Sequence, residues 1–337
     1  MPDLHPVAIW YPLIAFCIGC AGTAWLTKDL ARIGQADIPN NRSSHQRVTP
    51  RGGGLAIMAG FVVFAAFLGM NAGLLAMLGL LIGISWLDDR ATVSWQARLL
   101  GQCFVLGMSL AVLWVSGVLP ALHAPDAAIP LALFLGVIGF VWLWHINLFN
   151  FMDGIDGLAA IQAMIICFGA GAYFLDIADT TQALLALTLG AATLGFFVWN
   201  YPPARIFLGE VGSIPLGFLT GFFLLLLAAS GAWGLAIALP LWFWADATLT
   251  LARRLLTGHS IVTPHRAHFY QRAAGTTATG HKRVLHLFLL LQLLNCMFLA
   301  ACVKIFPDMP VLQPLISACF GILYFFALES LIQKKKT

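Results

Sequence analysis

The sequence predicts an all-α fold, a polytopic bundle of transmembrane helices that forms one integral-membrane domain over residues 1–337. Of its residues, 60% are hydrophobic and only 9% are charged, and the mean hydropathy is +0.89. A soluble domain carries roughly 25% charged residues, so lipid must cover much of this apolar surface. Runs such as Phe222 to Ala229 do not alternate apolar and polar residues as the strands of a membrane barrel do. The spans are therefore expected to be helices.

The elements follow from the length of the apolar runs, because a spanning helix needs roughly 20 apolar residues. The chain holds about eleven such runs, with ten as the alternative count. In order they are 7–27, 53–70, 73–88, 98–118, 129–147, 158–175, 181–199, 213–230, 233–252, 284–303 and 311–332.

Lysine and arginine predict the orientation, because they gather on the cytoplasmic side of membrane proteins. With the amino terminus outside, every one of the 18 except Lys304 lies inside. We therefore expect a periplasmic amino terminus and a multi-pass protein of the bacterial inner (cytoplasmic) membrane. The net charge of +4 then reflects topology, and no nucleic-acid partner is expected.

Six acidic residues lie at or near the predicted cytoplasmic ends of these helices. They are Asp88, Asp89, Asp153, Asp156, Glu210 and Asp246, the last within a predicted helix. An acidic side chain costs about 2.5–3.5 kcal/mol at the bilayer centre and less near its surface. Their convergence on one face predicts an active site on the cytoplasmic loops.

The segment 147–157 gives the strongest signal. Asn147, Asn150, Asp153 and Asp156 recur every three residues, which on a helix places neighbours on one face. Gly154 would allow a ligand to approach the backbone closely. A helix cap is the alternative interpretation, and it accounts for one aspartate but not for the whole stripe.

Two further acidic motifs suit a metal and phosphate. Adjacent carboxylates at Asp88 and Asp89 repel unless a cation or proton lies between them, and Mg²⁺ prefers such oxygen ligands. Glu210 follows Gly209 at a helix start, where phosphate or a metal-bound phosphate binds well. The alternatives are a polar helix end in water and a glycine-rich turn whose acid favours the helix dipole.

Basic residues cluster in the loop after the ninth predicted span. They lie among Arg253, Arg254, His259, His265, Arg266, His268, Tyr270, Gln271 and Arg272. Arginine contacts phosphate through paired hydrogen bonds, so a polyanionic substrate is one interpretation, and anionic lipid head groups are the other. Zinc is disfavoured because no third ligand has suitable spacing. Near Arg51, the glycines 52–54 would cradle phosphate or form a flexible helix entry.

Taken in order, these motifs resemble a known family. The Asp88-Asp89 pair and the segments 147–157, 207–213 and 266–268 are similar to those of the polyprenyl-phosphate N-acetylhexosamine-1-phosphate transferases. The similarity runs from Arg42 to Arg272. Within the family, the segments 44–54 and 265–271 look most like the O-antigen initiators that use a 6-deoxy sugar such as FucNAc or QuiNAc.

The resemblance implies a reaction in which an N-acetylated hexosamine 1-phosphate passes from a UDP-sugar to undecaprenyl phosphate and UMP leaves. It implies the first membrane step of O-antigen or cell-envelope polysaccharide synthesis. The implied partners are UDP-N-acetylhexosamine, undecaprenyl phosphate, membrane lipid and a second copy in a homodimer. The implied cofactor is Mg²⁺, with Mn²⁺ as the substitute.

The resemblance also implies roles for individual residues. Asp88 and Asp89 would be catalytic; Asn147, Asn150, Asp153, Gly154, Asp156, Asn200, Phe207, Arg51, Arg266 and His268 would bind substrate; and Glu210, Asp88 and Asp153 would bind metal. Two positions depart from the family pattern. Glu210 stands where the family has Asp, and His268 is followed by Phe269 and Tyr270 where the family often has further histidines.

Three alternatives are weighed against this interpretation. A transporter of a nucleotide-sugar or lipid-linked substrate explains the spans and acids, although its site would lie near the bilayer midplane. A phosphotransferase for CDP-activated alcohols would need a DGxxAR motif, whereas Asp156-Gly157 continues as Leu158-Ala159-Ala160. A lipid-binding scaffold leaves the clustered acids unexplained.

Overall fold

The fold is almost entirely α-helical, with 79% helix and 2% strand, and this confirms the predicted fold class. A computed structural model describes residues 6–32, 36–39, 47–91, 93–123, 129–260 and 265–333. Ser44 and His45, which carry part of the family resemblance, lie outside these residues.

The elements in chain order include fourteen α-helices, a 3-10 helix and two short strands. They are η1 (Pro6–Trp10), α1 (Tyr11–Arg32), β1 (Ala36–Asp37), β2 (Thr49–Pro50), α2 (Gly54–Phe67), α3 (Ala72–Arg90), α4 (Trp95–Val115), α5 (Val118–Leu122), α6 (Leu131–Phe151), α7 (Leu158–Asp176), α8 (Thr180–Asn200), α9 (Glu210–Ala229), α10 (Trp233–Ala238), α11 (Leu241–Leu256), α12 (Phe269–Ala274), α13 (Ala278–Ile305) and α14 (Leu312–Gln333). The strands pair antiparallel.

Within the described ranges, nine helices are long and apolar enough to cross a membrane. Two of the eleven predicted spans do not form a helix of this length. The run 53–70 forms only the 14-residue α2, which ends before Gly69 in the left-handed region at φ 78°. The run 233–252 divides into α10 and α11 on either side of Pro240, whose missing N–H interrupts a helix ladder.

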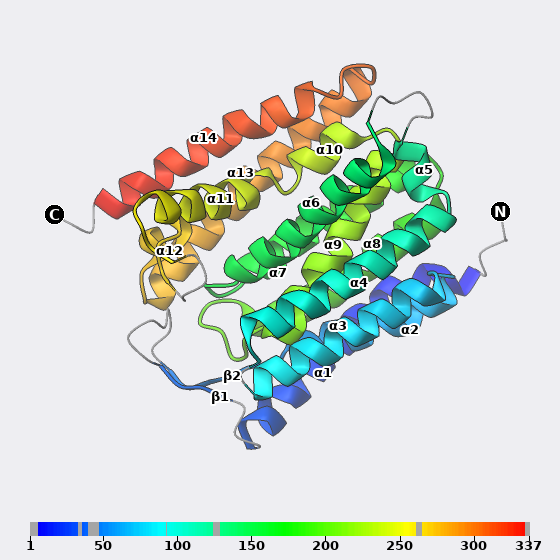
Figure 1. The fold of residues 1–337 in the computed structure, drawn as a ribbon. Coiled ribbons are helices and arrows are strands. Elements are labelled where there is room, and N and C mark those ends of the chain that lie inside the picture. The colour runs from blue at the N-terminus through cyan, green and yellow to red at the C-terminus, as the bar shows by residue number, and fades with distance from the viewer. Residues whose placement is uncertain are drawn as a thin grey trace.

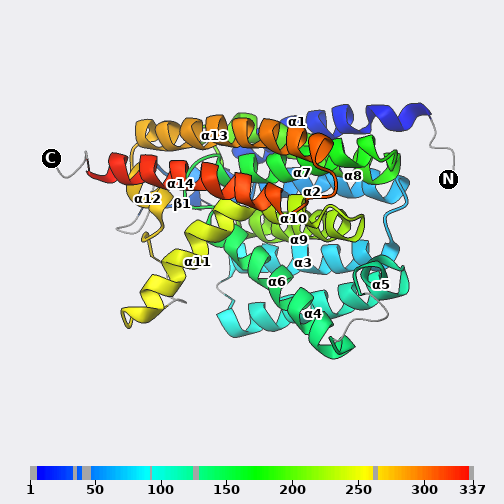
Figure 2. The ribbon, with the colours of Figure 1, turned by 90° about the horizontal axis from the view of Figure 1, so that it is seen from above.

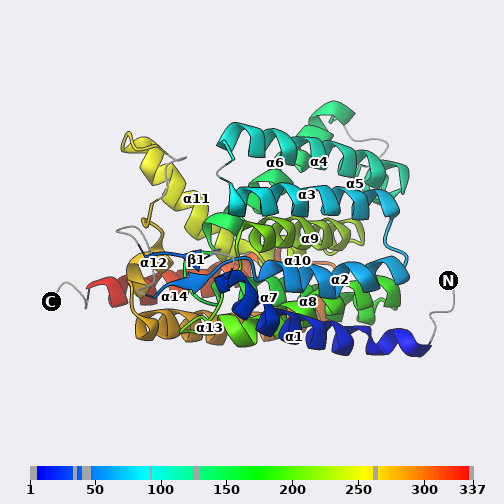
Figure 3. The same cartoon turned by 90° about the horizontal axis from the view of Figure 1, so that it is seen from below.

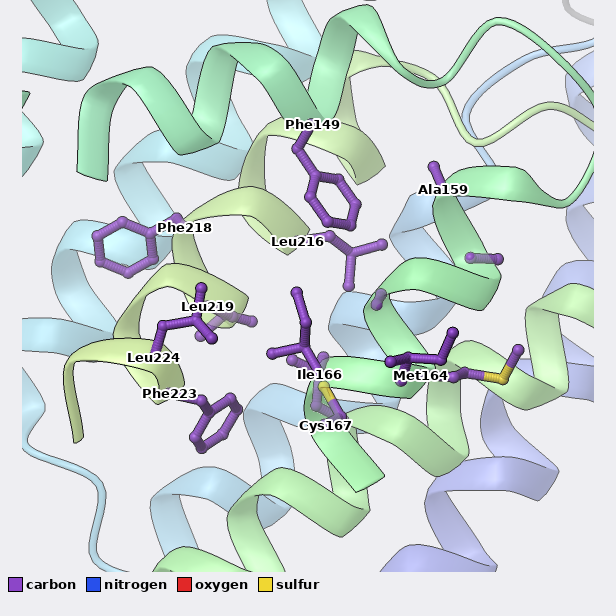
Figure 4. Close-up of a cluster of buried hydrophobic side chains, with 14 of the residues drawn as sticks. Phe149, Ala159, Met164, Ile166, Cys167, Leu216, Phe218, Leu219, Phe223 and Leu224 are labelled. Carbon is purple, nitrogen blue, oxygen red and sulfur yellow. The ribbon is translucent and has the colours of Figure 1, made fainter. Parts of the chain in front are cut away.

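Helix α9 forms the centre of the bundle. In its most apolar stretch, 89% of residues are buried, a larger share than in any other candidate span of the described chain. Small residues allow α6 to approach closely, because a Cβ at Gly217 would lie 2.9 Å from Ile146 Cα. Figure 4 shows Leu216, Phe218 and Phe223 of α9 among the buried side chains of α6 and α7.

The polar loops gather at one end of this bundle. The strands β1 and β2 and the short helix α12 lie at the end opposite the amino terminus (Figure 1). Seen from below, α4, α3, α9 and α2 run side by side toward that end (Figure 3). Helix α11 instead leaves the bundle at an angle, and its far end projects from it (Figure 2). Of the acidic residues predicted to form a site, Asp88 and Asp89 lie at the end of α3 and Glu210 begins α9.

Candidate active site

Asp89 holds the start of the central helix α9. Its Oδ1 accepts a hydrogen bond from the Glu210 N–H at 3.0 Å, and its Oδ2 accepts one from the Val211 N–H at 2.9 Å. Gly209, at φ 76°, makes room for this carboxylate, since a Cβ there would lie 2.7 Å from Asp89 Oδ2. The end of α3 and the beginning of α9 are thereby fixed to each other.

Asp88 points to a different partner, Arg98 on α4. Arg98 Nη1 lies 2.8 Å from Asp88 Oδ2, and it also donates to Glu210 Oε1 at 2.9 Å and Oε2 at 2.8 Å. Asp88 Oδ1 accepts the Val93 N–H at 3.0 Å. Three carboxylate oxygens from two helices therefore surround one guanidinium nitrogen. We call Asp88, Asp89 and Glu210 the acid cluster.

Arg51 is the second cation of the acid cluster. Its Nε lies 2.9 Å from Asp89 Oδ1, and its Nη2 lies 3.8 Å from Glu210 Oε1. Burial opposes its charge, but the carboxylates of Asp89 and Glu210 outweigh this effect and raise the pKa of Arg51. Arg51 therefore stays charged and remains 40% exposed at the mouth of the cluster.

The backbone of Phe207 positions Arg51. The Phe207 carbonyl accepts the N–H groups of Gly52 at 3.1 Å and Gly53 at 2.9 Å, and the Phe207 N–H donates to the Pro50 carbonyl at 2.8 Å. Gly54 packs on the Cα of Gly212, where a side chain would collide. The glycines 52–54 thus allow the backbone at the start of α2 to lie against Phe207 and the first turn of α9.

The predicted helical stripe over 147–157 is correct only for its first half. Helix α6 ends at Phe151, so Asp153 and Asp156 lie in the turn before α7. Gly157 in this turn has φ 79°, a conformation that favours glycine and interrupts a right-handed helix. On the helix itself, Asn150 Nδ2 donates to Ser213 Oγ at 2.9 Å and Asn147 Nδ2 donates to Gln102 Oε1 at 2.8 Å.

Asp153 is half-buried beside the acid cluster. Burial raises its pKa well above the usual range; Arg51 counteracts this, and the charges of Asp89 and Asp156 add to it. The neighbouring Gly154 faces α12, because a Cβ there would collide with the side chains of Tyr270 and Gln271.

Asp156 and Asn200 join the turn after α6 to the loop before α9. Asn200 Oδ1 accepts the Gly157 N–H at 2.8 Å, and its Nδ2 donates to the Ile206 carbonyl at 2.8 Å. Asp156 Oδ2 accepts the Ala204 N–H at 3.0 Å. Both side chains are buried. These contacts give Asn200 and Asp156 a role in shaping the loops.

His268 and the start of α12 form a second group around Asp246. The fully buried Asp246 accepts the N–H groups of Phe269 and Tyr270, each at 3.1 Å, and lies 3.3 Å from His268 Nδ1. Arg266 Nη2 donates to the Gly275 carbonyl at 3.2 Å. Asp246 therefore closes the start of α12 and pairs with His268.

A hydrogen bond links this group to the site. Tyr270 Oη donates to the carbonyl of Phe151, the last residue of α6, at 3.0 Å. Helix α12 thus supports the turn that carries Asp153.

Sequence reasoning missed Arg98 and His281. Arg98 lies in the first turn of α4, after the N-cap residue Ser94, where a positive charge opposes the helix dipole. That unfavourable placement was the available signal for a paired cation. His281 Nδ1 lies 3.3 Å from Asp156 Oδ2, although the two residues are 125 positions apart.

The acid cluster fits a divalent cation of the Mg²⁺ type. In the part of the chain that the structure describes, no three His, Cys, Asp or Glu side chains are grouped closely enough to form a metal centre by themselves. Mg²⁺ usually needs only one or two carboxylates, together with substrate phosphates and water. Asp88 and Glu210 already direct three oxygens to one position.

In the described part of the chain, nine membrane-length helices with acids and arginines at one pole define a multi-pass membrane enzyme suited to phosphate chemistry. The glycosyl transferase family 4 profile matches residues 70–228. An undecaprenyl-phosphate alpha-N-acetylglucosaminyl 1-phosphate transferase of Yersinia pestis is 32% identical over 71% of this chain and 69% of its own. A phospho-N-acetylmuramoyl-pentapeptide-transferase of Picosynechococcus is 30% identical over 70% of each chain. A probable undecaprenyl-phosphate N-acetylglucosaminyl 1-phosphate transferase of Bacillus subtilis is 28% identical over 77% and 75%.

The chain therefore belongs to glycosyl transferase family 4, the polyprenyl-phosphate N-acetylhexosamine-1-phosphate transferases. It is an enzyme of the phosphoglycosyl transferase class.

Proposed function

We propose that this enzyme transfers an N-acetylated hexosamine 1-phosphate from a UDP-sugar to undecaprenyl phosphate and releases UMP. The observation that carries the proposal is the convergence of Asp88, Glu210 and Arg98 beside Asp89 and Arg51 at one pole of the bundle. The names of the relatives support a polyprenyl phosphate acceptor and a phosphosugar donor. We place the acid cluster on the cytoplasmic face of a bacterial inner membrane, with the amino terminus in the periplasm.

The proposed reaction is a direct displacement. An oxygen of the acceptor phosphate forms a bond to the β-phosphorus of the donor, and the bond to the UMP oxygen breaks. The acceptor is a phosphate monoester with a second pKa of about 6, so it is mostly ionised at neutral pH and needs little base. Asp88 orients the acceptor or takes its residual proton, and the arginines bind the diphosphate.

The proposed cofactor is Mg²⁺, replaceable by Mn²⁺. Asp88 and Glu210 would hold the metal, with Asp153 next to them. The metal would neutralise negative charge on the diphosphate. Asp89 and Asn200 position the loops around this site. Arg266 and His268 are proposed to face the sugar across the turn that Tyr270 supports.

The test is UMP release by the purified protein with undecaprenyl phosphate and, in turn, UDP-GlcNAc, UDP-FucNAc and UDP-QuiNAc. UMP should appear with at least one donor and only with the acceptor; its absence in every combination would overturn the proposal. The donor preference decides between a 6-deoxy sugar, which would favour O-antigen synthesis, and GlcNAc.

Asp88→Asn and Glu210→Gln should each abolish turnover, whereas Asp308→Asn, exposed in the turn before α14, should retain it.

The covalent alternative has its own test. Labelled UDP-sugar is incubated with the protein in the absence of acceptor. A phosphosugar bound stably to the protein would contradict direct displacement.

A further inference from the structure

Arg98 occupies the position to which Asp88 and Glu210 direct their oxygens. Its Nη1 lies 2.8 Å from Asp88 Oδ2 and 2.9 and 2.8 Å from the two oxygens of Glu210. The carboxylates are 6% and 15% exposed and the Arg98 side chain is 26% exposed, so water screens these contacts only partly. A cation that took the same oxygens as ligands would require this nitrogen to move away.

We propose that Arg98 is an internal counter-cation that closes the acid cluster until a divalent cation binds and then gives way to it. The inference rests on the proposed function for the existence of that cation. Its physical basis is the repulsion between two partly buried carboxylates, which needs an opposite charge between them. Arginine is suited to this task because it is charged at every physiological pH.

The displaced Arg98 side chain can still act in the reaction. Arg98 is anchored in the first turn of α4, whose start is fixed by Ser94 Oγ accepting the Ala97 N–H at 3.3 Å. The guanidinium therefore swings about a fixed backbone and stays near the cluster. The N–H groups of its planar guanidinium match the oxygens of a diphosphate. After the metal binds, Arg98 therefore becomes a positioning residue for the UDP-sugar.

The Glu210 side chain is long enough to contact Arg98 from the start of α9. Its backbone N–H is held by Asp89 at 3.0 Å, so the distance from α9 to Arg98 is spanned by the side chain alone. An aspartate at 210 keeps the charge but lacks one methylene, and it would draw both oxygens back from Arg98 Nη1. Glu210→Asp therefore loosens the contact with Arg98 while retaining a metal-binding carboxylate.

The test measures Mn²⁺ binding to the full-length purified protein by the loss of the free-ion signal in electron paramagnetic resonance. Arg98→Gln should tighten binding by about tenfold if Arg98 fills the position nine-tenths of the time, since occupancy by a competitor reduces apparent affinity in proportion. Glu210→Asp should change binding by a smaller factor, because the shorter side chain draws its oxygens back from the metal position as well as from Arg98. Arg90→Gln is the matched control: it removes the same charge from the end of α3, where Arg90 stacks on Trp86, and should leave binding unchanged.

Two further readouts separate this role from a merely structural one. Mn²⁺ should raise the unfolding temperature of Arg98→Gln more than that of the wild type, because only the variant lacks the positive charge between Asp88 and Glu210. At saturating metal, Arg98→Gln should raise KM for the UDP-sugar. Equal or weaker Mn²⁺ binding by Arg98→Gln overturns the inference but leaves the transferase reaction standing. If no form binds Mn²⁺ while UMP is released, the counter-cation role is also wrong and only the reaction survives.

Discussion

Asp89 and Glu210 are joined through the backbone, because the Asp89 carboxylate accepts the Glu210 N–H at 3.0 Å. Negative charge at a helix N-terminus is favourable, and here it also sets the position of a second acid. The two adjacent aspartates therefore have different surroundings: Asp89 binds the start of α9, and Asp88 binds Arg98.

This difference predicts separable effects of two matched substitutions. Asp89→Asn leaves one oxygen to accept two N–H groups and removes the partner of Arg51, so it should destabilise the protein by about 1–3 kcal/mol. Asp88→Asn should abolish UMP release with a smaller loss of stability. Thermal unfolding in detergent, run beside the activity assay, distinguishes the two. Equal unfolding temperatures for the two variants would contradict the assignment.

Asn200 offers a second prediction. Asn200→Ala strands the buried Gly157 N–H and Ile206 carbonyl, at a cost of about 1–3 kcal/mol for each unsatisfied group. Asn200→Asp keeps the acceptor for Gly157, and its carboxyl can donate to the Ile206 carbonyl only when protonated, so at low pH its unfolding temperature should fall less than that of Asn200→Ala. The prediction fails if the aspartate variant is as unstable as the alanine variant.

Gly209 and Gly231 form a matched pair for a third prediction. Both have positive φ, 76° and 90°, so alanine costs on the order of 1–3 kcal/mol of backbone strain at either position, and more at Gly209, whose ψ of 168° lies in a region adopted almost only by glycine. At Gly231 a Cβ meets nothing within 4 Å, whereas at Gly209 it lies 2.7 Å from Asp89 Oδ2. Gly209→Ala should therefore be the more destabilising and should also reduce UMP release. Similar unfolding temperatures would show that Asp89 moves aside freely.

The helices could be predicted from the sequence because the bilayer imposes its demand locally, as a length of apolar chain. In the sequence, Pro240 was a signal for the break between α10 and α11, and Gly157 was a signal for the turn after α6. The length of the apolar run and the three-residue spacing nevertheless favoured continuous helices. The partners of the acids could not be predicted in the same way. Arg98 and Glu210 are 112 residues apart and meet only through packing of α3, α4 and α9. Residue type therefore predicted candidate side chains for the site, and tertiary structure decides what each one contacts.

Asp153 gives a prediction about pH. Burial raises its pKa in the folded protein, whereas an exposed aspartate titrates near about 3.9. Between these two pKa values the folded state holds a proton that the unfolded state has lost, so the contribution of Asp153 to stability is present at low pH and declines as pH rises. Asp153→Asn does not titrate. Its unfolding temperature, relative to wild type, should therefore increase with pH from about 4 upward.

The measurement is thermal unfolding without divalent cations across that range, at one scan rate because membrane proteins often unfold irreversibly. All titrating groups other than Asp153 are shared by the two proteins, so the difference reports Asp153 and its interactions with charged neighbours such as Asp89 and Asp156. Asp308→Asn, which removes the negative charge of an exposed aspartate far along the chain from Asp153, is the control variant. Parallel curves for Asp153→Asn and wild type would show that Asp153 is ionised in the folded protein. A cation that binds beside Asp153 should favour its charged form, so adding Mg²⁺ should shrink the difference between Asp153→Asn and wild type at neutral pH.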